Sequence, residues 1–246
     1  MKKIMTVILS ILMIIITIFS FSGCIFEEGP IMTYGDFTYC YVRDADQNSR
    51  STKVNGKYIA ILELTEEGQQ KETIVIPETI EGKTVILIGM SGLFWGKDLR
   101  TSGGIYNKIY LPPCLQQVRG DSDLFPPIKK FLIKVPEKIF FQNISGVYYV
   151  PEVDFYKYQK YMELNYITIS VANLTYMVDG EVYWIDDYDN GEYIKFPQTP
   201  QKEGYIFDGW YKEPEYLIEW NETLDQYSKS KDNKTMNLYA KWIETE

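Results

Sequence analysis

The segment 74–89, which reads IVIPETIEGKTVILIG, decides the fold of the first two thirds of the chain. It begins with an alternating apolar strand, 74–76, that runs straight into Pro77. Proline closes a strand because it has no backbone N–H for the ladder. The same strand-then-proline unit recurs at 109–112 (IYLP), 132–136 (LIKVP) and 147–151 (VYYVP). Such repetition predicts a solenoid, in which each repeat buries one face on its neighbours.

Segment 74–89 resembles the opening repeat of the BspA-type leucine-rich repeats of bacterial surface proteins. The closing unit of that family is mirrored by 147–151, and a short helix is expected at 153–162. Leucine-rich repeats are roughly 20–29 residues long, whereas the prolines here step by 35, 24 and 15 positions, so one interval fits. The resemblance therefore implies a short, irregular leucine-rich-repeat solenoid over 31–171.

A pair of strands is expected ahead of this segment. Residues 37–42 (FTYCYV) and 58–62 (YIAIL) are rich in aromatic and β-branched side chains, and a polar loop at 44–57 separates them. Runs of this kind bounded by polar loops are typical of β-strands.

The character of the sequence changes near 170–174, and a domain boundary is predicted between 171 and 172. Residues 181–185 (EVYWI) and 192–196 (EYIKF) flank Asn190-Gly191. Asn-Gly between alternating apolar runs is the strongest short-range signal of a hairpin. Two further strands are expected at 204–211 (GYIFDGWY) and 236–242 (MNLYAKW).

The order of motifs over 174–242 resembles the internalin B-type repeat, also called the Listeria–Bacteroides repeat. The motifs that carry the resemblance are Pro197 and Pro200, EGY at 203–205, FDGWY at 207–211, Trp220 and LYAKW at 238–242. The resemblance implies a small β-grasp-like module over 172–246, typical of secreted or surface proteins and without catalytic residues. The fold class expected for the chain is mainly β: the irregular solenoid followed by this module.

Residues 1–23 have the composition of a secretion signal peptide. Lys2 and Lys3 precede an apolar run at 4–22, and the small residue Gly23 stands before Cys24. The letters FSGC at 21–24 resemble the lipobox of bacterial lipoproteins, whose cysteine is acylated and becomes the new N-terminus. The resemblance implies cleavage between Gly23 and Cys24 and a two-chain lipid on Cys24, with acyl groups such as palmitate.

Two lipid chains anchor a protein stably in a membrane, where one chain does so only marginally. Residues 24–30 would then form a tether of about 20–25 Å. As the alternative, an apolar run of 18 or more residues can span the bilayer as an uncleaved helix. In that alternative the positive-inside bias keeps Lys2 and Lys3 inside, and the rest of the chain still faces the exterior.

Composition excludes several functions. A net charge of −9 disfavours nucleic acid and anionic lipid as partners, because both attract Lys and Arg. The chain has no histidine, which rules out Ser–His and Cys–His nucleophile pairs and His-ligated metal sites. It has no glycine-rich phosphate loop and no C-x-x-C motif, so no cofactor and no metal is predicted. Cys40 and Cys114 are expected to be free thiols rather than a disulfide.

The acidic run 186–191 (DDYDNG) is a candidate calcium loop. An EF-type loop needs oxygen ligands at positions 3 and 12, where this run would place Tyr188 and Pro197. The register fails, and an ordinary acidic hairpin turn is expected.

Aromatic residues are the remaining candidates for a binding site. Trp210 and Trp242 are expected in the core, where such rings bury the most area. Tyr110, Tyr148 and Tyr149 lie on the expected solenoid strands and are predicted to form an exposed row that contacts a ligand.

The sequence therefore predicts a non-catalytic bacterial lipoprotein on the extracellular side of the cell membrane, which binds a protein or glycan of a host or neighbouring cell. Two alternatives stay open. A carboxylate-based glycan hydrolase would require two acids roughly 5–9.5 Å apart in a cleft. A passive envelope spacer would bind no specific ligand.

Overall fold

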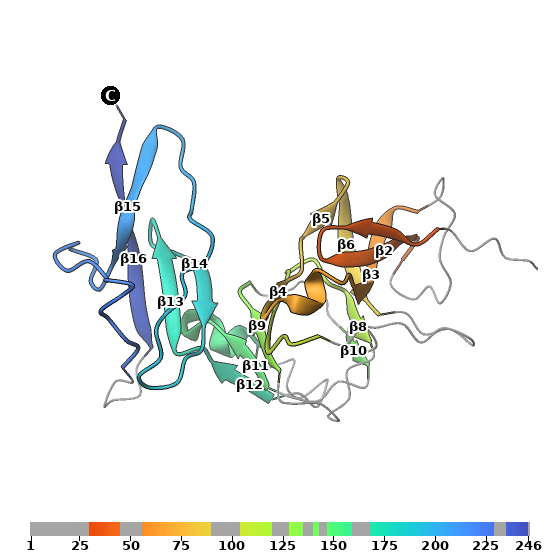
Figure 1. Ribbon diagram of the computed structural model, residues 1–246, viewed down its shortest axis with the longest axis horizontal. Helices are drawn as coiled ribbons and strands as arrows, with labels where there is room; N and C mark the ends of the chain where they lie inside the picture. The colour runs from red at the N-terminus through yellow and green to blue at the C-terminus, as the bar shows by residue number, and fades with distance from the viewer. Residues whose placement is uncertain are drawn as a thin grey trace, which may run out of the picture.

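The computed structural model describes residues 30–44, 56–89, 104–119, 128–134, 140–142, 147–158, 168–228 and 235–245. The chain is mainly β and contains several sheets, as expected from its sequence. Figure 1 shows two groups of strands side by side. Residues 30–171 form the group called the first part, and residues 172–245 form the module.

The first part contains a seven-stranded and a five-stranded sheet. The seven-stranded sheet has the order β1 (Met32–Tyr34), β2 (Phe37–Val42), β3 (Tyr58–Leu64), β6 (Lys83–Ile88), β8 (Gln117–Arg119) and β10 (Phe140–Gln142), with β5 (Thr79–Ile80) paired to β6. The five-stranded sheet has the order β12 (Thr168–Val171), β11 (Val147–Val150), β9 (Lys129–Leu132), β7 (Lys108–Leu111) and β4 (Thr73–Val75).

From β4 onward the chain alternates between these two sheets. It runs from β4 to β6, then through β7, β8, β9 and β10 to β11, and every pairing among β4, β7, β9, β11 and β12 is parallel. One register row contains Ile74, Ile109, Lys130, Tyr148 and Ile169. Its four uncharged members are buried in the same core, and Lys130 is 7% exposed. Stacked parallel strands thus place mostly apolar residues above one another.

Five strands of the described first part match strands expected from the sequence. The antiparallel pair expected at 37–42 and 58–62 is present, with β3 extending to Leu64, and the strands before Pro77, Pro112 and Pro151 are confirmed. The strand expected at 132–135 is wrong, because β9 ends at Leu132 and bends at 133–134. Its register with β7 explains the shift: Leu132 pairs with Leu111, so both strands end together.

The helix expected at 153–162 is present as far as the described residues extend. A 3-10 turn, η2 (Glu152–Asp154), continues as helix through Tyr158. Tyr158 is fully buried and donates its hydroxyl hydrogen to the Leu132 carbonyl at 3.0 Å. This turn therefore ties the end of β11 to the end of β9.

The module contains one four-stranded sheet in the order β14 (Glu181–Asp186), β13 (Leu174–Val178), β16 (Met236–Glu244) and β15 (Tyr205–Tyr211). The two central strands, β13 and β16, are parallel, and the outer pairings are antiparallel. Its core consists mainly of rings, with Tyr176, Trp210 and Tyr227 among the most buried side chains.

The hairpin of the module is not the one expected at Asn190-Gly191. Asp179-Gly180 joins β13 to β14 instead, with φ values of 49° and 84°. Positive φ at both positions is what a two-residue hairpin turn of type I′ requires. At Asn190-Gly191 only Gly191 has positive φ, and 192–196 forms no strand, only an isolated bridge between Tyr193 and Gln226.

Gly23 and Cys24 lie outside the described residues, as does the whole segment 1–29. The signal peptide and the lipidation of Cys24 therefore stay predictions. Among the residues that are described, no helix has the length and apolar character needed to cross a membrane.

Candidate functional site

The first part and the module meet on the outer face of the five-stranded sheet. Tyr110, Phe131 and Tyr149 are register neighbours on β7, β9 and β11 and form a continuous aromatic row there. The ring centroids of Tyr110 and Phe131 are 4.6 Å apart, and those of Phe131 and Tyr149 are 5.3 Å apart. Because successive residues of a strand point to opposite faces, this row faces away from the core of the first part.

Strand β14 of the module covers this aromatic row. The Trp184 ring lies with its centroid 4.0 Å from that of Tyr110, and Val182 and Ile185 pack in the same cluster. Phe131 and Ile185 are both 0% exposed. The junction is therefore a small hydrophobic core shared by the two parts.

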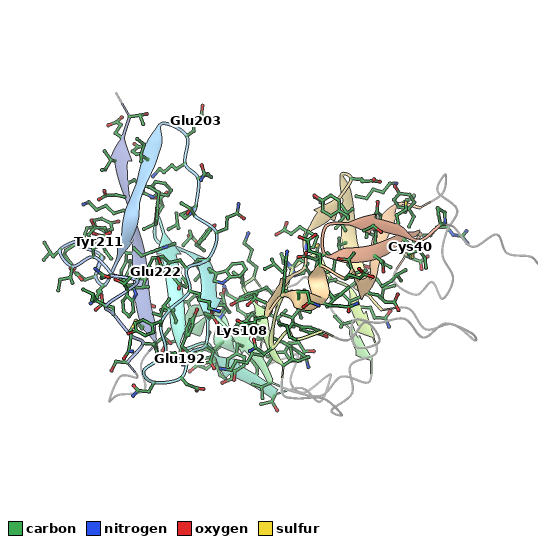
Figure 2. The ribbon with its side chains drawn as sticks, in the orientation of Figure 1. Cys40, Lys108, Glu192, Glu203, Tyr211 and Glu222 are labelled. Carbon is green, nitrogen blue, oxygen red and sulfur yellow. The ribbon has the colours of Figure 1, made fainter. Side chains whose placement is uncertain are left out.

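A row of lysines beside the aromatic row pairs with the acidic end of β14. Lys108 Nζ lies 2.6 Å from Asp186 Oδ1, and Lys129 Nζ lies 2.8 Å from Asp187 Oδ2. Lys108 Nζ also lies 4.1 Å from the ring centroid of Tyr188. The Lys108 and Asp186 side chains are only 17% and 7% exposed, so this pair is largely shielded from water. Figure 2 shows Lys108 where the two parts meet.

The junction raises the pKa of several groups. Burial and then the Asp186 charge raise the pKa of Tyr110 well above its ordinary value. Burial lowers the pKa of Lys129, but the hydrogen bond and charge of Asp187 outweigh burial and raise that pKa overall. At neutral pH the tyrosine is therefore uncharged and the lysine is charged, as the packing requires.

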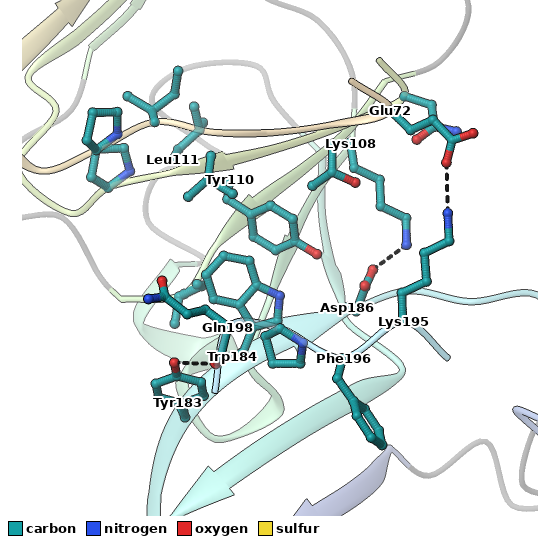
Figure 3. Close-up of a pocket in the computed structure, with 18 of the residues that line it drawn as sticks. Glu72, Lys108, Tyr110, Leu111, Tyr183, Trp184, Asp186, Lys195, Phe196 and Gln198 are labelled. Atoms are coloured by element: carbon teal, nitrogen blue, oxygen red, sulfur yellow. Dashed lines mark hydrogen bonds and ion pairs between the residues drawn. The ribbon is translucent and has the colours of Figure 1, made fainter. Parts of the chain in front are cut away.

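A groove of about 790 Å³ opens beside the junction, between β4 and β7 on one side and the module on the other. The side chains of Tyr110, Tyr183, Trp184 and Gln198 line it, as Figure 3 shows. The Tyr183 hydroxyl donates to the Gln198 carbonyl at 2.6 Å, which fixes the segment after β14 against that strand. Ligand pockets usually have volumes of roughly 300–1,000 Å³ and often lie at domain interfaces.

Two carboxylates of the groove are each paired with a lysine. Asp186 pairs with Lys108 in the interior, and Glu72 pairs with Lys195 at 2.9 Å where both side chains are exposed. The hydrogen bond and charge of Lys195 lower the pKa of Glu72. The ion pairs join the first part to the module and also cancel most of the groove's charge.

The exposed tyrosine row predicted from the sequence is wrong. Tyr110 is 3% exposed and lies in the junction, where it also borders the groove. Tyr148 is fully buried in the core of the first part, because it neighbours Tyr149 in the strand and must face the opposite way. Tyr149 is half-buried beneath the module.

The predictions for the tryptophans and the cysteines agree better with the structure. Trp210 is 1% exposed, as expected for a core residue, and Trp242 is half-buried and packs on the same cluster. Cys40 and Cys114 are free thiols, which confirms that prediction. Cys40 is fully buried, and Cys114 donates its S–H to the Val85 carbonyl at 3.2 Å.

The acidic run at 186–191 is not the ordinary hairpin turn expected from its sequence. Asp186 ends β14 and Asp187 follows it, and both point at lysines of the first part. In the described part of the chain, no group of three or more Cys, Asp or Glu side chains could hold a metal ion.

Sequence reasoning missed the lysines of the junction, although they leave a signal. Lys108 begins the strand KIYL and Lys129 begins KKFL, so a lysine stands two positions before an aromatic residue in two successive repeats. A period-2 spacing places both on one face of a strand. Their charge on an otherwise apolar face points to an acidic partner that covers it.

One family comparison bears on this arrangement. The sequence pattern of the Listeria-Bacteroides repeat domain matches residues 173–241. The match begins just before β13 and ends within β16, so it covers the module and leaves out the first part. The repeat predicted over 174–242 from its aromatic motifs is thereby confirmed. No curated protein matches the chain in sequence.

Proposed function

We propose that the chain is a non-catalytic binding protein on the surface of a bacterium, with adhesion to a host or neighbouring cell as its role. The observation that carries this proposal is the groove at the junction, which has an aromatic lining and lysine-paired carboxylates. A groove between two parts that share a buried cluster keeps its shape without a ligand, and preorganisation favours binding. The Listeria-Bacteroides repeat, which resembles modules of surface proteins, supports the same conclusion.

For the first part we infer a short leucine-rich-repeat solenoid. The supporting observation is that the chain alternates between two sheets whose strands from β4 to β12 pair in parallel, apart from β5, which is antiparallel to β6. For the module we infer a β-grasp-like sheet, because its first and last strands, β13 and β16, lie side by side and parallel at the centre.

Binding without turnover fits the state of the groove's acids better than hydrolysis does. A glycan hydrolase needs one carboxylic acid whose pKa is raised so that it can donate a proton. Lys195 lowers the pKa of Glu72, and Asp186 is held by Lys108 at 2.6 Å. Glu72 and Asp186 are therefore arranged as salt-bridge partners rather than as proton donors. The other two carboxylates of the lining, Glu78 and Glu192, are exposed to water rather than enclosed in an apolar site.

The proposed anchor is a lipid on Cys24, which would place the protein on the extracellular side of the membrane. Strand β2 and the module lie at opposite ends of the molecule (Figure 1). Residues 24–30 can extend about 20–25 Å. On this arrangement the first part stands next to the membrane, and the groove and the module face outward.

The Cys24→Ala variant of the full chain tests the anchor. Produced in a bacterium, it should move from the membrane fraction to the medium or remain as an unprocessed precursor, because the acylated sulfur is missing. Cys114→Ala is the matched control and should stay in the membrane fraction. Unchanged membrane retention of Cys24→Ala together with unchanged gel migration would contradict lipidation.

Release of sugar from any bound glycan by the purified protein would contradict the non-catalytic role.

A further inference from the structure

We infer that the groove binds a neutral oligosaccharide, with Trp184 as the stacking surface and the Gln198 amide as a hydrogen-bonding partner. This inference rests on the proposed binding function and names its ligand class. Three features of the groove carry it: its rings, its charge balance and its neutral polar groups.

The rings provide an apolar surface that is rigid and still accessible. Trp184 is held against Tyr110 at 4.0 Å and is only half-buried, and it borders the groove together with Tyr183. Figure 3 shows the Trp184 indole beside Tyr110 and Gln198 in the groove. A ring fixed by its neighbours costs little conformational entropy when a ligand packs on it. The C–H faces of a sugar ring are flat and apolar, and they suit such a surface.

The charge of the groove selects against ionic ligands. The Asp186 and Glu72 carboxylates are each paired with a lysine. Three further charged residues line the groove, Glu78, Glu192 and Lys134, and all three are exposed. The lining therefore has four carboxylates and three lysines of mixed position, so neither an acidic glycan nor a charged peptide meets a patch dominated by the opposite sign. Complementary potential is what directs charged partners to an interface.

The neutral polar groups of the groove match hydroxyl groups. Gln198 and Asn107 line the groove and are exposed. A carboxamide offers both donors and an acceptor, so it can bind a hydroxyl group in either sense. A volume of about 790 Å³ lies toward the upper end of the usual range for ligand pockets, which favours several sugar rings over one.

Two variants of the full-length protein, purified in a detergent without a sugar headgroup, test this site on an array of neutral glycans, acidic glycans and peptides. Gln198→Ala removes a hydrogen-bonding group, and affinity should fall about three- to tenfold. Val75→Trp adds a ring on a side chain that is 48% exposed and lines the groove, and it should abolish binding. The control is Tyr156→Ala, which removes an 82% exposed ring outside the groove and should bind normally.

Each outcome of this experiment is informative. Neutral glycans bound by the wild type and the control, but weakly or not at all by the two groove variants, support the inference, provided that all variants melt like the wild type. Neutral glycans bound equally by every variant overturn the groove as the site. Binding only to acidic glycans or peptides overturns the ligand class while the binding function stands. Failure to bind any array member or whole cells overturns both proposals.

Discussion

The first part and the module are stabilised by different kinds of core. In the first part, rows of isoleucine, leucine and valine from successive parallel strands fill most of the space between the sheets. In the module, rings meet edge to face: Tyr176 and Trp210 at 4.9 Å, and Phe207 and Trp210 at 5.3 Å between centroids. One core depends on repeated aliphatic positions, and the other depends on a few large rings in fixed orientations.

Architecture explains this difference. Stacked parallel strands place residues of the same register in one row, where β-branched and aliphatic side chains pack well. The module has one four-stranded sheet and longer connections, so few side chains must cover its apolar face. Aromatic residues bury the most area per residue, and their edge-to-face contacts add roughly 0.5–1.5 kcal/mol for each pair.

The junction between the first part and the module shows how the type of side chain depends on what packs against it. The row on the outer face of the five-stranded sheet contains Tyr110, Phe131 and Tyr149, and it is aromatic at the place where the module covers it. The inner face of the same strands contributes Ile109, Leu111, Leu132 and Val150 to the core of the first part, together with Tyr148. The rings therefore concentrate on the face that the module covers.

Alkaline titration should produce the largest difference between the two parts. Burial raises the pKa of Tyr176 and Tyr188 in the module and of Tyr110 at the junction, and it raises the pKa of Tyr39 in the first part to about 12. Below the ordinary tyrosine pKa of about 10 these residues are protonated in both the folded and the unfolded protein, and stability is at its full value. As the pH rises further, they lose their protons only in the unfolded protein, so the free energy of unfolding falls. At about pH 11 each such tyrosine destabilises the native state by roughly 1.4 kcal/mol.

The module should therefore lose its structure first as the pH rises above about 10. Tryptophan fluorescence reports this directly, because four tryptophans lie in the module: Trp184, Trp210, Trp220 and Trp242. Tyr176→Phe should shift the fluorescence midpoint to higher pH, since it removes one ionisable group from the unfolded chain. A tyrosinate absorbance that rises fully near pH 10 while the fluorescence stays native would contradict the assignment.

Truncation of one core residue in each part compares the cores directly. Trp210→Ala removes the ring at the centre of the module and should lower the free energy of unfolding by about 3–5 kcal/mol. Ile61→Val removes one methylene from a fully buried site in the first part and should cost about 0.5–1.5 kcal/mol. Denaturant unfolding followed by circular dichroism measures both. Equal losses would show that the aromatic core tolerates change as well as the aliphatic one does.

Some strands of each part were predictable because their apolar runs end at clear signals. Pro77, Pro112 and Pro151 mark strand ends, and the aromatic spacing of 204–211 identifies β15. The position of β9 was not predictable in this way. Residues 131–135 (FLIKV) are nearly all apolar and could form a strand over their whole length, so only the pairing with β7 decides where the strand lies.

The hairpin and the site were mispredicted because both depend on contacts between distant segments. Asp179-Gly180 and Asn190-Gly191 are both favourable turn sequences, and local preference cannot choose between them. The chain leaves the sheet after Asp186 because that carboxylate and the next one pair with lysines of the first part. The groove is lined by residues from 72 to 198, which no local pattern brings together.

Ion pairs of the junction offer smaller effects than Trp210→Ala and the sharpest test of how the two parts are joined. Asp186→Asn keeps the shape of the side chain but leaves the Lys108 ammonium without its carboxylate in a largely buried site. Hydrogen bonds between charged groups contribute roughly 1.5–3 kcal/mol, so a loss of about 2 kcal/mol is expected. Lys195→Ala is the matched control, because its pair with Glu72 is exposed, and it should cost at most about 1 kcal/mol.

High salt should further distinguish the energetic contributions of these two ion pairs. High ionic strength screens the exposed Lys195–Glu72 pair, so the cost of Lys195→Ala should vanish in high salt, while the cost of Asp186→Asn should persist. Denaturant unfolding at low and high salt gives both values. If salt removes both costs, water and salt reach Lys108 and Asp186, and this pair contributes no more to the junction than an exposed pair does.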